Sequence, residues 1–115
     1  MKMTGEQLLM RIFIGEDDIY EHRPLYKAIV EMFRREGLAG ATVVKGIAGY
    51  GAHSVYHTDH ILRLSSDLPL VIETVDTEEK INSVLPLLDE MVGEGLITLE
   101  KARVIKYTHR KKGGQ

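Results

Sequence analysis

The stretch from Leu8 to Ile14 is apolar on both of its alternating faces, and this feature most constrains the fold. One face carries four aliphatic side chains, Leu8, Met10, Ile12 and Ile14. The other face carries Leu9 and Phe13, with Arg11 between them. A strand of this kind is covered by other parts of a protein on both sides. The chain should therefore pack other elements against both faces of this strand.

Two helices are predicted further along the chain. The first runs from about Pro24 to Glu36, because proline suits a first helical turn and apolar residues recur at helical spacing after it. The second opens at Asp76, which forms a capping-box pattern with Glu79. Pro86 lies inside this second helix and removes one backbone donor. We expect it either to kink the helix or to leave the freed carbonyl facing water.

Three more strands are predicted. The first covers Ala41 to Lys45 and leads into a glycine-bearing shoulder over residues 46–51. The next covers Leu68 to Val75. The last extended region is expected in two pieces, Leu96 to Leu99 and Arg103 to Tyr107. The resulting order is strand, helix, strand, strand, helix, strand.

This order predicts a ferredoxin-like βαββαβ fold of the α+β class, in which both helices lie on one face of a four-stranded antiparallel sheet. We expect a single domain over residues 1–115. Four apolar side chains would point away from the helices: Leu9, Phe13, Val71 and Val75. Leaving them in water is unfavourable by roughly 25 cal/mol per Å². Self-association would cover them, although Arg11 and Glu73 interrupt the patch, so a monomer stays an alternative.

Composition narrows the possible functions. The chain has no cysteine, which excludes disulfides, thiolate zinc sites and cysteine nucleophiles and suits a reducing compartment. Its formal net charge of −2 provides no overall field for nucleic acid, so we expect none as a partner. No segment has the pattern of a signal peptide or a membrane span, and we predict a cytoplasmic protein. The basic tail over about 108–115 is interpreted as a frayed end rather than a phosphate-binding arm.

A long polar segment over about 52–67 is predicted to be a mobile loop. It carries His53, His57 and His60, which a helix would place on one face and which could ligate zinc or nickel. An exposed polar loop also collects histidines without any metal, and both interpretations stay open. The serines of this segment have no G-x-S-x-G elbow or local base beside them, so we predict that the chain is not an enzyme.

Two glycine clusters are the other candidate site: Gly49-Tyr50-Gly51 and Gly93-Glu94-Gly95. Neither matches a standard nucleotide-binding motif, and each alone is typical of a turn. Both nevertheless fall at the ends of predicted sheet elements, where exposed backbone N–H groups can surround an anion. Arg103 and Lys106 belong to the second piece of the last predicted strand, and their positive charges could neutralise that anion.

Six stretches spread over nearly the whole chain match the pattern of a known family. They are Arg11–Glu16, Arg23–Val30, Gly37–Val43, Gly49–Ala52, Leu68–Glu73 and Gly93–Glu100. Together they resemble an uncharacterised PII-like family. More distantly, the chain is similar to the PII nitrogen-signalling proteins, whose second strand also ends in a Gly-aromatic-Gly element before a long mobile loop.

The resemblance implies a regulatory protein that forms a homotrimer, with the sheets facing inward and adenine nucleotide in the clefts between subunits. ADP or ATP would then be an effector, with no prosthetic group. By motif, Gly40, Ala41 and Thr42 correspond to the strand that meets the adenine, and the second glycine cluster corresponds to the loop at the phosphates. Arg103 and Lys106 lie where a neighbouring subunit offers basic groups.

The resemblance also implies a target protein to which the mobile loop presents the bound state. Relatives accompany fluoride-export membrane proteins, which suggests a membrane transporter as that target. The alternative function is divalent-metal binding through the three loop histidines, as in the trimeric CutA family of the same fold.

Overall fold

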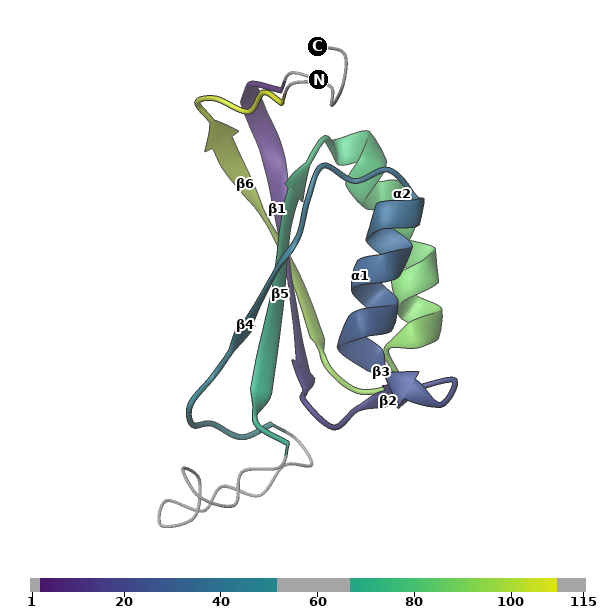
Figure 1. The fold of residues 1–115 in the computed structure, drawn as a ribbon. Coiled ribbons are helices and arrows are strands. Elements are labelled where there is room, and N and C mark those ends of the chain that lie inside the picture. Colours follow the sequence, from purple (N-terminus) through teal and green to yellow (C-terminus); the bar gives the residue numbers. More distant parts are fainter. Residues whose placement is uncertain (1–2, 52–66, 110–115) are drawn as a thin grey trace.

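Four strands form one antiparallel sheet, and two helices cover one of its faces (Figure 1). The structure is a computed structural model and describes residues 3–51 and 67–109. The sheet has the order β4-β5-β1-β6 and consists of β1 (Gly5–Gly15), β4 (Thr42–Lys45), β5 (Pro69–Asp76) and β6 (Leu96–Val104). The helices are α1 (Leu25–Arg35) and α2 (Glu78–Met91). The predicted ferredoxin-like α+β fold is confirmed.

The central strand is β1, which pairs with β5 on one side and with β6 on the other. Its alternating pattern sorts the side chains as predicted. Met10 and Ile12 are fully buried on the face that the helices cover, whereas Leu9 and Phe13 are only half-buried on the opposite face. We call this second, uncovered side the open face of the sheet.

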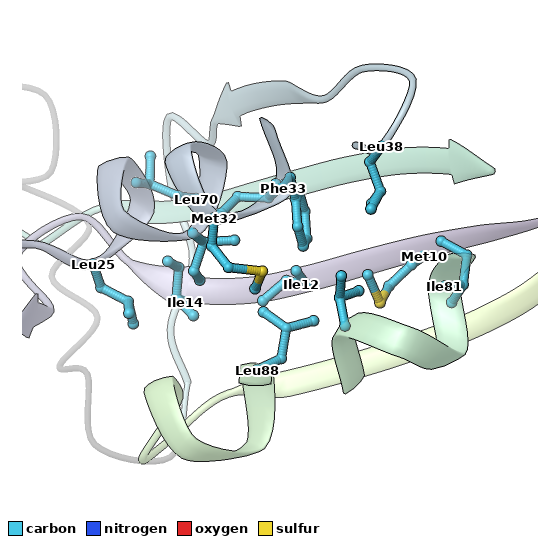
Figure 2. Close-up of a cluster of buried hydrophobic side chains, with 13 residues drawn as sticks. Met10, Ile12, Ile14, Leu25, Met32, Phe33, Leu38, Leu70, Ile81 and Leu88 are labelled. Atoms are coloured by element: carbon cyan, nitrogen blue, oxygen red, sulfur yellow. The ribbon is translucent and has the colours of Figure 1, made fainter. Parts of the chain in front are cut away.

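The core lies between the covered face and the two helices (Figure 2). From α1 it takes Leu25, Ala28, Ile29, Met32 and Phe33, and from α2 it takes Ile81, Val84 and Leu88. These positions recur at helical spacing, so one stripe of each helix faces the sheet. Their burial removes apolar surface from water and holds both helices on one side.

Helix α2 runs without interruption through Pro86. Both Pro86 and Asn82, whose carbonyl loses its hydrogen-bond donor, are exposed. Both residues thus lie on the solvent-facing side of the helix, as the second of the two expected arrangements requires.

The helix begins differently from the capping-box prediction. Thr77, not Asp76, is the N-cap, and its side chain accepts a hydrogen bond from the Lys80 amide at 3.2 Å. Asp76 is instead the last residue of β5 and is fully buried. The prediction was off by one residue because aspartate and threonine are both favoured N-cap residues and the two are adjacent in the sequence.

Pro24 is the N-cap of α1 and Glu36 is its C-cap, so the predicted bounds of the first helix agree with the structure to within one residue. Pro24 also belongs to a short hairpin of β2 (Ile19–Tyr20) and β3 (Arg23–Pro24), in which it pairs with Ile19.

The boundaries of the final strand differ from the prediction. The final strand is one element rather than two pieces, because residues 100–102 pair directly with β1. The charged residues Glu100 and Lys101 separate the two predicted pieces, but the backbone of an edge strand can pair whatever its side chains are.

The segment over about 52–67 lies almost wholly outside the described residues, as does most of the basic tail. Among the helices that the structure describes, none is long and apolar enough to cross a membrane.

Candidate functional site

A groove of about 390 Å³ lies at the end of the sheet where β1 begins and β6 ends. We call it the first groove. It brings together four of the predicted site residues, Gly40, Ala41, Thr42 and Lys106. The rest of its lining comes from Met3, Leu9, Ala39, Glu73, Thr74, Val75, Val104 and Tyr107. Residues that are more than sixty positions apart in the sequence thus face one space.

The end of α1 directs the chain into this groove. Gly37 has a φ of 85°, a backbone conformation that glycine adopts without strain, and its amide donates to the Arg34 carbonyl at 3.2 Å. The next amide, that of Leu38, reaches back to the Phe33 carbonyl at 3.0 Å. These two bonds form a Schellman motif. Leu38 then enters the core, and residues 39–42 are left along the groove.

A second groove of about 480 Å³ lies at the opposite end of the sheet. It contains four other predicted residues, Tyr50, Gly51, Glu94 and Gly95. Its other lining residues are Phe13, Ile14, Gly15, Asp18, Asp67, Pro69 and Leu96. Both grooves include side chains of the open face, and they reach β1 at Leu9 and Phe13, roughly 13 Å apart along the strand.

Gly95 has a packing reason for being glycine. A Cβ atom there would lie 2.8 Å from the Phe13 carbonyl oxygen and 3.0 Å from Cγ1 of Val92. The contact with the backbone oxygen is too short for a real side chain, and the contact with Val92 is tight, so the start of β6 approaches β1 this closely because the residue is glycine. Gly40 differs, because a Cβ atom there would meet nothing within 4 Å.

Three predicted residues line neither groove: Gly49, Gly93 and Arg103. Gly49 has a φ of 153° and lies against the Pro69 ring, 3.1 Å from where its Cβ atom would be. Arg103 is exposed on β6, where it is paired in register with Glu6 of β1.

The two grooves differ in charge. Lys106 is the basic residue of the first groove and, like Arg103, makes no ion pair with the part of the chain that the structure describes. The second groove contains three carboxylates, Asp18, Asp67 and Glu94. The first groove also contains the Glu73 carboxylate, which is ion-paired with Arg11, so Lys106 is the charge it offers to an anionic ligand. The carboxylates of the second groove would repel such a ligand unless a cation accompanied it.

An ion-pair network lies on the open face between the two grooves. Arg11 donates from Nε to Glu73 at 2.8 Å and from Nη1 to Glu100 at 2.5 Å. The hydrogen bonds to Glu73 and then to Glu100 raise the pKa of Arg11. At the rim of the sheet, Lys45 contacts Glu16 at 2.9 Å, and this hydrogen bond lowers the pKa of the Glu16 carboxyl.

The predicted metal ligands His53, His57 and His60 lie outside the described residues. In the ranges 3–51 and 67–109, no three side chains of the metal-ligating types come together as a metal site.

Sequence reasoning missed Thr74, which lines the first groove, and Asp76, which is buried beneath it. The available signal was the pattern of β5. Its inward positions read Leu70, Ile72, Thr74 and Asp76, so two polar residues follow two aliphatic ones on a buried face. Buried polar side chains need hydrogen-bond partners, and such an interruption marks a place where the backbone of another segment approaches.

Proteins with this topology include PII-like signalling proteins. The chain matches the structure of CPII, a nitrogen regulatory PII-like protein of Thiomonas intermedia bound to ADP, AMP and bicarbonate, with a TM-score of 0.63 and 15% identity over 90% of this chain and 98% of that one. It matches a structure described as a PII-like signalling protein of Thermus thermophilus with a TM-score of 0.61 and 21% identity, over 88% and 91% of the two chains. These likenesses define the fold as PII-like.

Closer relatives place the chain in a family. It is 46% identical over 99 residues to a UPF0166 protein of Methanocaldococcus jannaschii, covering 85% of this chain and 91% of the relative. A UPF0166 protein of Aquifex aeolicus is 44% identical over 107 residues, covering 91% and 98%. Residues 7–104 match the DUF190 family, described as "Uncharacterized ACR, COG1993". The chain belongs to this DUF190/UPF0166 family.

Proposed function

We propose that this protein is a regulatory binding protein that holds an adenine nucleotide between the subunits of a homotrimer and presents the bound state to a target protein. Its action is binding, not catalysis. ADP and AMP are bound in the structures of CPII, which has the same fold. The target, which we expect to be a membrane transporter, would be contacted through the segment between β4 and β5.

One observation carries the proposal. The predicted site residues separate into two groups at opposite ends of the sheet, one with Gly40, Ala41, Thr42 and Lys106 and one with Tyr50, Gly51, Glu94 and Gly95. The Arg11 network lies between them on the open face. A site that uses both groups needs the first groove of one subunit and the second groove of its neighbour.

Charge favours the same arrangement. Joining the first groove of one copy to the second groove of the next places Lys106 opposite the carboxylates Asp18, Asp67 and Glu94. Opposite charges across an interface steer association and fix its register. Lys106 would then supply positive charge for the phosphates of the nucleotide, and a cation accompanying the phosphates would offset the carboxylates of the second groove.

The test combines light scattering with titration calorimetry. We expect a trimer mass and heat on addition of ADP, ATP or AMP. Replacing Lys106 with alanine should weaken binding roughly ten- to hundredfold, because a hydrogen bond to a charged group contributes about 1.5 to 3 kcal/mol. Lys101→Ala is the matched control, since Lys101 is an exposed lysine of β6 that lines neither groove.

A second variant tests the groove itself. The chain has open space for a methyl group at Gly40, so Gly40→Ala should fold normally and yet narrow the space beside the ligand. A monomer mass, no heat with any adenine nucleotide at millimolar concentration, or equal losses in Lys106→Ala and Lys101→Ala would overturn the proposed function.

A further inference from the structure

The turn at Ala39 and Gly40, which forms one wall of the first groove, is held by three side chains from other parts of the chain. The Ala39 amide donates to Oδ2 of Asp76 at 2.8 Å. The Thr74 hydroxyl donates to the Gly40 carbonyl at 2.6 Å. The Tyr107 hydroxyl donates to the Ala39 carbonyl at 3.3 Å. Backbone groups of the turn are thus bonded from β5 and from the segment after β6.

Asp76 is the centre of this arrangement. It is fully buried, and its second carboxylate oxygen, Oδ1, accepts from the Thr77 amide at 2.7 Å. Thr77 is the N-cap of α2, so the carboxylate also lies at the positive end of that helix dipole. A buried charge is costly unless hydrogen bonds replace its water, and here two backbone amides do so. One carboxylate therefore ties the groove wall to the start of α2.

Figure 1 shows the same connection at the level of the fold, with the segment between α1 and β4 passing beside the end of β5 and the start of α2. Thr74 and Asp76 occupy two consecutive inward positions of β5, where the preceding inward residues are Leu70 and Ile72. The core needs only apolar residues at such positions, and the two polar ones serve the turn at Ala39 and Gly40.

We propose that Thr74 and Asp76 are positioning residues of the first groove, which hold residues 39–42 in the shape that receives the nucleotide. This inference rests on the proposed function. Asp76 acts entirely through the backbone, since it does not line the groove. A wall that is ordered before the ligand arrives does not lose conformational entropy on binding. A variant in which residues 39–42 are less ordered should therefore bind the ligand more weakly.

The Thr74 hydroxyl offers the sharpest test, because valine has nearly the same shape and no donor. We expect Thr74→Val to bind ADP about three- to tenfold more weakly than the wild type by calorimetry. Thr74→Ser keeps the hydroxyl and should bind as the wild type does. Amide hydrogen exchange at residues 39–41 should become faster in Thr74→Val and in Asp76→Asn but not in Thr74→Ser.

A core variant distinguishes the positioning role from a general loss of stability. Val84 is fully buried in α2 and lines neither groove, so Val84→Ala lowers stability without touching the wall. It should leave ADP affinity and the exchange of residues 39–41 unchanged. Wild-type affinity in Thr74→Val, or an equal loss in Val84→Ala, would overturn the positioning role alone. A wild-type protein that binds no adenine nucleotide would overturn the proposed function and this inference with it.

Discussion

Ile12 and Phe13 are neighbours on β1 and face opposite sides of the sheet, and their surroundings differ. Ile12 is fully buried among residues of both helices, whereas Phe13 is half-buried on the open face and lines the second groove. The covered face is wholly apolar along the centre of β1, but the open face carries Arg11 with its two carboxylate partners. One face of the sheet therefore supplies folding stability, and the other is available for association and binding.

The largest effect should come from the covered face. Ile12→Ala leaves a cavity in a packed core, and such changes cost about 2 to 5 kcal/mol of the free energy of unfolding. Phe13→Ala removes a larger side chain but should cost less in the unassembled protein, because that side chain is already partly in water. Urea unfolding at low protein concentration compares the two, and a greater loss in Phe13→Ala would break the distinction between the faces.

Association should depend on the open face alone. Phe13→Lys places a charge in the surface that we propose to be covered in the trimer, and it should raise the dissociation constant more than tenfold, which corresponds to about 1.4 kcal/mol. Asn82→Lys adds the same charge on the exposed side of α2 and should leave the mass unchanged. Light scattering over a dilution series measures both, and the open face is not the interface if the two variants behave alike.

The Arg11 network reports whether the open face is covered. In an unassembled chain these ion pairs are partly exposed, and Arg11→Met should change the free energy of unfolding little. In a trimer that buries the network, the same change leaves Glu73 and Glu100 without their partner and should lower the free energy of unfolding much more. Unfolding measured below and above the assembly concentration separates these cases, and an identical small cost at both would argue against burial.

The smallest effect should come from the rim of the sheet. The hydrogen bond from Lys45 lowers the pKa of Glu16 from 4.5, so the stabilisation is fully present above that value and is lost as the pH falls through the lowered pKa. Glu16→Gln should remove this part of the acid dependence, because it lowers stability slightly above that pH and leaves it unchanged in acid, where the wild-type carboxyl is already protonated. Thermal unfolding across the acid range measures it. Unaltered acid dependence in the variant would show that the ion pair contributes nothing.

The fold could be predicted because its main signals are local. The apolar residues at both alternating positions from Leu8 to Ile14 indicate a strand with two packed faces, since successive side chains of a strand point to opposite faces. The apolar spacing of α1 and α2 is equally a property of neighbouring residues. The error at Asp76 fell at a boundary, where two neighbouring residues could serve as the N-cap and only packing selects one.

The candidate site was predictable only as a set of residue types. The sequence by itself determined which glycines and basic residues were available, and its resemblance to the PII-like family suggested what they bind. Only the tertiary structure decided that Gly40 and Lys106 share one groove while Tyr50 and Gly95 share another. It also decided that Asp76 is buried against the Ala39 amide. Such groupings depend on strand order and register, which are set by contacts between distant parts of the chain and leave no local pattern in the sequence.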